Sequence, residues 1–129
     1  MSKPCNPETQ LRQDILGSIG ALPGLMIWIN KIGVAEVRSG GKITFGGPAG
    51  SADLIGCYYG TPVGLEIKTP TGRQSDVQRA WERAWSAVGG FYAVVRSPDE
   101  ALAALEESRS ACQPKPNNTS STAPSSGLR

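Results

Sequence analysis

The spacing of apolar positions predicts three amphipathic helices. The first begins at Asn6-Pro7, a typical N-cap and N1 pair, and places an apolar residue at every fourth position. The second begins at a capping box, Ser75 to Gln78, and runs to Gly89-Gly90, and a last helix follows Ser97-Pro98. The residues expected on the core faces of the last two helices are Trp81, Trp85, Val88, Leu102 and Leu105.

Between these helices the pattern changes to short β-rich runs separated by glycine and proline. We interpret residues 25–30, 34–38, 42–45, 53–58, 63–68 and 91–96 as strands. Ser39-Gly40-Gly41 predicts a hairpin between the second and third strands, and Gly60-Thr61-Pro62 predicts another between the fourth and fifth. The order of helices and strands predicts an α/β sandwich with a mixed β-sheet flanked by helices.

The chain has the length of one domain. Its 129 residues are 39% hydrophobic, which is enough for one modest core. We expect a flexible N-terminus over residues 1–5 and a folded unit over residues 6–107. Residues 108–129 are rich in Ser, Pro and Asn and poor in apolar residues, so we expect a disordered tail there.

Composition narrows the chemistry that the chain can perform. The formal net charge is only +2, which neither requires nor excludes a nucleic-acid partner. Histidine is absent, which removes the commonest zinc ligand and favours a hard cation held by oxygen. The three cysteines lack C-x-x-C spacing and fit a reducing compartment as free thiols. No apolar run approaches the roughly 20 residues that cross a bilayer, so we expect a cytoplasmic protein with no membrane partner.

Candidate chemistry lies in the hairpin formed by the fourth and fifth strands. Alternation along residues 63–68 sends two apolar side chains to one face and Glu66 and Lys68 to the other. If the turn centres near Gly60, antiparallel pairing brings Asp53 to within about two residues of Glu66. Two carboxylates that close would repel each other unless a cation such as Mg²⁺ shared them. A solvent-facing charged pair on an edge strand explains the same pattern equally well.

The motifs around these residues resemble a nuclease family. Residues 50–56 contain Asp53, residues 64–75 contain Glu66 and Lys68, and residues 78–81 follow them. In order and spacing these segments are similar to the VRR-NUC family of the PD-(D/E)xK nuclease superfamily. The resemblance extends from Glu8 to about Leu105 and implies a restriction-endonuclease-like core. Ala52 stands where that family usually has proline, a change that removes no ligand.

The resemblance implies roles for individual residues in a metal-dependent nuclease. Asp53 and Glu66 would bind Mg²⁺ or Mn²⁺ together with the Ile67 carbonyl, and Lys68 would assist the attacking water. Gln78 would lie at the site from the following helix, although it is also an ordinary capping-box residue. Glu8 resembles the acid that the superfamily often supplies from its first helix, and an acid in the first turn that interacts with the helix dipole is equally consistent.

A second group of residues is expected to contact DNA. The glycine-rich loop 46–51 would let backbone amides approach phosphates closely, with cations around it. Asn30 resembles a family position near the site, and it is equally well explained as a strand-terminating asparagine. The DNA-binding candidates are Asn30, Lys31, Arg38, Lys42, Gly47, Ser51 and Arg73. Each single cation among them is also explained as a solvated surface charge. The three tryptophans could stack bases, but their spacing favours a place in the core.

These patterns lead to one functional expectation and two alternatives. We expect a metal-dependent DNA endonuclease that acts on branched or four-way (Holliday) junction DNA as a homodimer, because resolving a junction needs two cuts. The stand-alone viral and bacterial members of the family suggest the cytoplasm of a bacterium or of a phage-infected cell. The alternatives are a less selective repair or restriction-associated nuclease and a non-catalytic DNA-binding module with the same fold.

Overall fold

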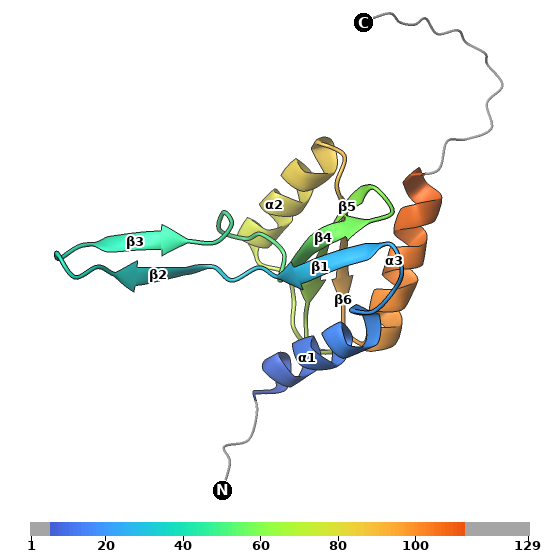
Figure 1. Ribbon diagram of the computed structural model, residues 1–129, viewed down its shortest axis with the longest axis horizontal. Helices are drawn as coiled ribbons and strands as arrows, with labels where there is room; N and C mark the ends of the chain where they lie inside the picture. Colours follow the sequence, from blue (N-terminus) through green and yellow to red (C-terminus); the bar gives the residue numbers. More distant parts are fainter. Residues whose placement is uncertain (1–5, 113–129) are drawn as a thin grey trace, which may run out of the picture.

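The computed structural model describes residues 6–112, and the predicted N-terminal segment 1–5 and residues 113–129 of the predicted tail lie outside the described residues. Along the described part, three helices and six strands follow one another (Figure 1). They are α1 (Pro7–Ile19), β1 (Leu25–Ile29), β2 (Gly33–Glu36), β3 (Lys42–Phe45), β4 (Leu54–Tyr58), β5 (Thr61–Ile67), α2 (Asp76–Ala87), β6 (Phe91–Val95) and α3 (Pro98–Cys112).

Four strands form a central sheet in the order β1-β4-β5-β6. β1, β4 and β5 pair antiparallel, whereas β6 pairs parallel to β5 because α2 carries the chain back to the same end of the sheet. The predicted mixed sheet flanked by helices is therefore confirmed.

The two faces of this sheet differ in what covers them. The first, which we call the core face, carries Leu54, Val63 and Leu65 against α1 and α3, where Ile15 and Leu105 are also fully buried. The opposite face, which we call the α2 face, carries the alternate residues of the same strands. None of the residues of α2 is fully buried, so this helix covers its face only partly.

The helix starts form as their local sequences predict. Asn6 Oδ1 accepts a hydrogen bond from the Glu8 N–H at the start of α1. At the start of α2, Ser75 Oγ accepts from the Gln78 N–H, and Gln78 Oε1 accepts from the Ser75 N–H. The capping box is thus complete, and it satisfies backbone donors that a helix start otherwise leaves unpaired.

Two predictions about local structure are wrong. The turn between β4 and β5 consists of Tyr59 and Gly60, both with positive φ, so Thr61 and Pro62 belong to β5 instead of the turn. A two-residue turn of this kind matches the twist of the strands, and Pro62 precedes the part of β5 that pairs with β6. Val88 was expected in the core but is 78% exposed, because α2 ends at Ala87 before that residue can pack.

The predicted hairpin between β2 and β3 forms, but as a separate two-stranded sheet. Its register pairs Gly33 with Phe45 and Glu36 with Lys42, so β2 ends earlier than expected. Figure 1 shows this hairpin projecting sideways from the body of the molecule. Two of its apolar side chains, Val34 and Ile43, are more than half exposed.

The C-terminal helix is longer than predicted. α3 continues to Cys112, so the boundary placed at residue 107 falls too early. Ser108 is fully buried and donates to the Leu105 carbonyl, and the Arg109 guanidinium lies 4.0 Å from the centre of the Tyr59 ring. The contact of Arg109 with Tyr59 joins the last turns of α3 to the β4–β5 turn.

Within residues 6–112, none of the helices combines the length and the apolar character needed to cross a membrane.

Candidate active site

Asp53 and Glu66 meet at the end of the β4–β5 hairpin. The register pairs Leu54 with Leu65, so the next residues outward on the two strands are Asp53 and Glu66. Because Leu54 and Leu65 point into the core face, their neighbours point to the α2 face. We call Asp53 and Glu66 the carboxylate pair.

Glu66 is unusual because it is a buried acid with an unused oxygen. Its side chain is only 2% exposed. Oε2 accepts a hydrogen bond of 2.9 Å from Gln78 Nε2 and lies 3.8 Å from Lys68 Nζ. Oε1 has no hydrogen-bond partner among the described residues. A buried carboxylate oxygen without a partner is costly, so this atom needs a proton or a cation.

The surroundings of Glu66 favour its neutral form in the absence of a cation. Its pKa is raised from 4.5 to about 8, mainly because burial disfavours the charged form and to a smaller extent because Asp53 carries a negative charge nearby. The Lys68 ammonium opposes these effects, and Glu8 adds a smaller one in the same direction as Asp53. Two neighbouring carboxylates repel each other when both are ionised, so a cation that binds between them would be stabilised by both charges.

Asp53 is held from both sides. Its Oδ2 accepts from the Ile67 N–H at 2.9 Å, and its carbonyl accepts from the Asn30 N–H at 2.8 Å. The Asn30 side chain donates to Ser51 Oγ at 2.7 Å and to the Ala52 carbonyl at 3.0 Å. Asn30 is therefore a positioning residue, which fixes the segment that leads into Asp53.

Gln78 is both a capping-box residue and a neighbour of the carboxylate pair. Its oxygen completes the capping box with Ser75, and its nitrogen donates to Glu66. One side chain thus connects the start of α2 to the carboxylate pair, so the position of the helix and the orientation of Glu66 depend on each other.

The residues present fit a metal with few protein ligands. Glu8 is exposed, and across residues 6–112 no group of three or more His, Cys, Asp or Glu residues is arranged to hold an ion. Asp53 and Glu66 alone would supply the carboxylates, which matches the one or two typical of Mg²⁺. The partnerless Oε1 of Glu66 supports this fit. The ligand roles of the Ile67 carbonyl and of Glu8 stay predictions.

Two cations share a cavity with Asp53. A cavity of about 320 Å³ is lined by Asp53 together with Arg12, Asn30 and Lys31. Sequence reasoning missed Arg12 because it occupies an ordinary helical position in α1. Its only signal is its place one turn after Glu8 on the same helix.

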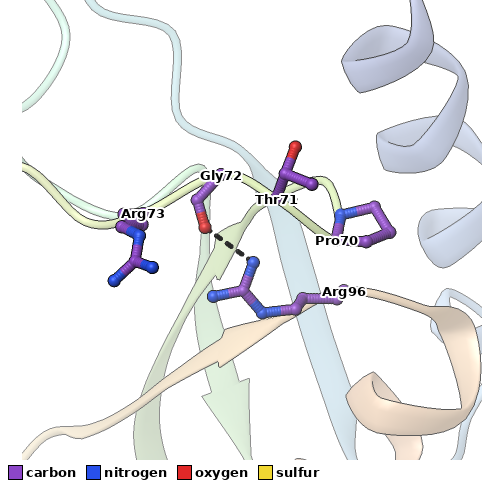
Figure 2. A pocket seen from close by; sticks show the side chains of 5 residues that line it. All are labelled: Pro70, Thr71, Gly72, Arg73 and Arg96. Atoms are coloured by element: carbon purple, nitrogen blue, oxygen red, sulfur yellow. Dashed lines mark hydrogen bonds between the residues drawn. The ribbon is translucent and has the colours of Figure 1, made fainter.

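Two arginines line a second cavity, of about 480 Å³, beside the loop that follows Lys68 (Figure 2). The Arg96 guanidinium donates to the carbonyls of Thr69 and Gly72 at 2.6 and 2.7 Å. Within the described residues neither Arg73 nor Arg96 forms an ion pair with a carboxylate. Arg73 was a predicted DNA contact, whereas Arg96 was read only as the end of a strand.

The remaining DNA-binding candidates divide into two groups. Gly47 and Ser51 lie beside Asn30, and a Cβ added at Gly47 would approach Ser51 Oγ to 2.7 Å, so the glycine permits this close packing. Arg38 and Lys42 belong to the outer end of the β2–β3 hairpin, away from the carboxylate pair (Figure 1). The structure therefore does not bring these two cations to the candidate site.

No protein-family model matches this chain, and no curated protein matches it either. The VRR-NUC resemblance accordingly rests on the motif residues. The site itself is defined by the carboxylate pair, by Lys68 and Gln78 beside Glu66, and by the cavity that Arg12 and Lys31 share with Asp53.

Proposed function

We propose that this chain is a divalent-metal-dependent DNA endonuclease with a restriction-endonuclease-like core of the VRR-NUC type. The observation that carries the proposal is the carboxylate pair, in which a buried Glu66 lies beside Asp53 and its Oε1 has no hydrogen-bond partner within residues 6–112. A purely structural acid in that position would normally have its hydrogen bonds satisfied.

Asp53 and Glu66 are the residues that would hold Mg²⁺ or Mn²⁺. When bound, such an ion polarises a phosphoryl oxygen and offsets the charge that develops during phosphodiester hydrolysis. Lys68, beside Glu66, can orient a water or stabilise negative charge on the phosphate. Gln78 holds the Glu66 carboxylate in place, and Asn30 does the same for the segment before Asp53.

The cations around the pair support DNA as the substrate. Arg12 and Lys31 share a cavity with Asp53, and Arg73 and Arg96 line another without a carboxylate partner in residues 6–112. Guanidinium groups in such positions suit backbone phosphates, which supply most of the affinity for DNA.

Branched DNA, in particular a four-way junction, is the proposed substrate, and a homodimer is the proposed working form. One folded unit carries one carboxylate pair, whereas resolving a junction needs two cuts on opposing strands. A less selective nuclease is the alternative, and it would work as a monomer.

The test is a cleavage assay on duplex, single-stranded, flap and four-way junction DNA with Mg²⁺, Mn²⁺ or Ca²⁺. We expect cleavage with Mg²⁺ and Mn²⁺, and losses of about a hundredfold or more in Asp53→Asn, Glu66→Gln and Lys68→Ala. Glu106→Gln, which removes an exposed charge from α3, is the matched control and should cut normally.

Two outcomes would contradict the proposal. Cleavage that survives complete chelation would exclude the metal mechanism. A wild-type protein that binds DNA but cuts none of the four substrates with any of the metals would favour the non-catalytic binding module.

A further inference from the structure

All three tryptophans of the chain line a single cavity. Trp28 comes from β1, and Trp81 and Trp85 come from α2, so the cavity lies on the α2 face of the sheet. Its volume is about 380 Å³, and Ile55 and Pro48 complete its apolar wall. We call it the tryptophan pocket.

One wall of this pocket is rigid. The rings of Trp81 and Trp85 are stacked, with centroids 4.8 Å apart and planes 19° from parallel. Trp85 Nε1 donates to the Phe91 carbonyl at 3.0 Å, which fixes the ring. Gly64 lets both indoles lie against β5, because a Cβ there would come within 3.4 Å of them. The wall is therefore formed before any ligand arrives.

The other wall is open to solvent. Trp28 was expected in the core, yet it is 52% exposed on the edge strand β1, opposite Ile55 in the register. A half-exposed indole beside two others leaves a large aromatic surface in water, and such surfaces usually mark binding sites. Trp28 is not among the side chains that form the hydrophobic core or pack against it.

We propose that the tryptophan pocket binds an unpaired nucleobase of the DNA strand that is cut at the carboxylate pair. This inference rests on the proposed nuclease function. Every nucleobase offers a flat π-face, and stacking on aromatic side chains is the common way in which proteins hold single-stranded bases.

The position of the pocket favours a base over other occupants. Asn30 and Ser51 line the pocket, and the same two side chains brace the segment that leads into Asp53. The tryptophan pocket is therefore adjacent to the candidate active site, and the two share Asn30 and Ser51. Its two polar side chains can reach the edge of a base.

The consequence for substrate choice is a preference for DNA with unpaired bases near the cut. Flaps, junction branch points and the boundaries between single and double strands offer such bases at little cost, whereas an intact duplex must first be unstacked.

The experiment measures binding by fluorescence anisotropy in EDTA, so that no strand is cut. The probes are a labelled single-stranded oligothymidine, an abasic strand of the same length and charge, and a duplex. Trp28→Ala should weaken oligothymidine binding about tenfold while changing duplex and abasic binding less than about twofold. Trp28→Phe should restore much of the loss, since a flat ring remains.

Met26→Ala is the matched control. Met26 lies two residues before Trp28 on the same side of β1 and is 71% exposed, but it does not line the pocket. It should leave all three affinities unchanged. Melting curves of both variants should match the wild type, because both side chains are largely outside the core.

Several results would overturn the inference. One is that Trp28→Ala weakens the binding of oligothymidine and of the abasic strand equally. Another is that Met26→Ala weakens binding as much as Trp28→Ala does. A third is that light scattering detects a dimer that Trp28→Ala dissociates. Base-dependent binding by a protein that cuts no DNA would overturn the nuclease proposal while supporting the pocket. DNA cleavage by a protein that binds the oligothymidine and the abasic strand equally well would support the nuclease proposal and overturn the pocket.

Discussion

The two faces of the central sheet are built from the same strands but differ in their chemistry. On the core face, Leu54, Val63 and Leu65 are fully buried against α1 and α3. On the α2 face, the adjacent positions carry a buried acid, a half-buried isoleucine and, on the edge strand β1, a half-exposed indole, and one helix covers this face only partly.

This difference shows how a small domain separates stability from function. Strict alternation lets one strand supply a leucine to one side and a glutamate to the other. The core face provides the apolar burial that drives folding, so the α2 face can keep polar groups whose hydrogen bonds are incomplete.

The first prediction compares neighbouring residues of β4 that point to opposite faces. Leu54→Ala should lower the free energy of unfolding by about 3 kcal/mol, because it leaves a cavity in a fully buried core. Ile55→Ala should cost only about 1 kcal/mol, because Ile55 is partly exposed beside the tryptophan pocket. Urea denaturation measures both values, and equal losses would show that both faces contribute alike to stability.

The second prediction concerns the pH dependence of stability in the metal-free protein. The folded state holds the Glu66 proton up to a pKa of about 8, whereas 4.5 is the ordinary value. Stability from this group is therefore complete below pH 4.5 and is lost as the pH rises toward 8. The free energy of unfolding should therefore fall steadily between about pH 5 and pH 7.

Glu66→Gln is the control for this slope, since the amide has the same shape and no titrating proton. Urea denaturation in EDTA at several pH values should show a much flatter profile for the variant. A variant that keeps the full slope would mean that another group titrates, and the α2 face would then be less strained than the structure implies.

The third prediction separates the two roles of Gln78. Gln78→Ala should cost about 1 kcal/mol of stability through the lost cap, and it should also reduce cleavage about tenfold because Glu66 loses its donor. Ser75→Ala removes the other half of the capping box and should cost similar stability. Cleavage by Ser75→Ala should stay near the wild-type level, and an equal fall in both variants would assign Gln78 a capping role alone.

Sequence patterns predicted the local features best. The caps at Asn6 and Ser75 depend on side chains that reach only two or three residues along the chain, so their spacing identifies them. The alternation that sends Glu66 away from the core was visible for the same reason. Its convergence with Asp53 followed from hairpin pairing, even though the turn was placed slightly too late.

The features that sequence could not supply depend on tertiary packing. Trp28 is apolar, but whether it is buried depends on how many helices cover the α2 face, and Val88 is exposed because α2 ends just before it. Arg96 gave no signal of its own, because its role depends on the carbonyls of a loop more than twenty residues earlier. Periodicity identifies which side a residue faces and not what lies opposite it.

The short turn at Tyr59 and Gly60 has a consequence for the order of folding. A tight hairpin closes within about 1–10 μs, and it brings Asp53 and Glu66 together using only contiguous chain. The core face must wait for α1 and α3, which come from opposite ends of the described residues and close much longer loops. Hairpin closure alone therefore brings the two acids together while water still surrounds them, before α1 and α3 cover the core face.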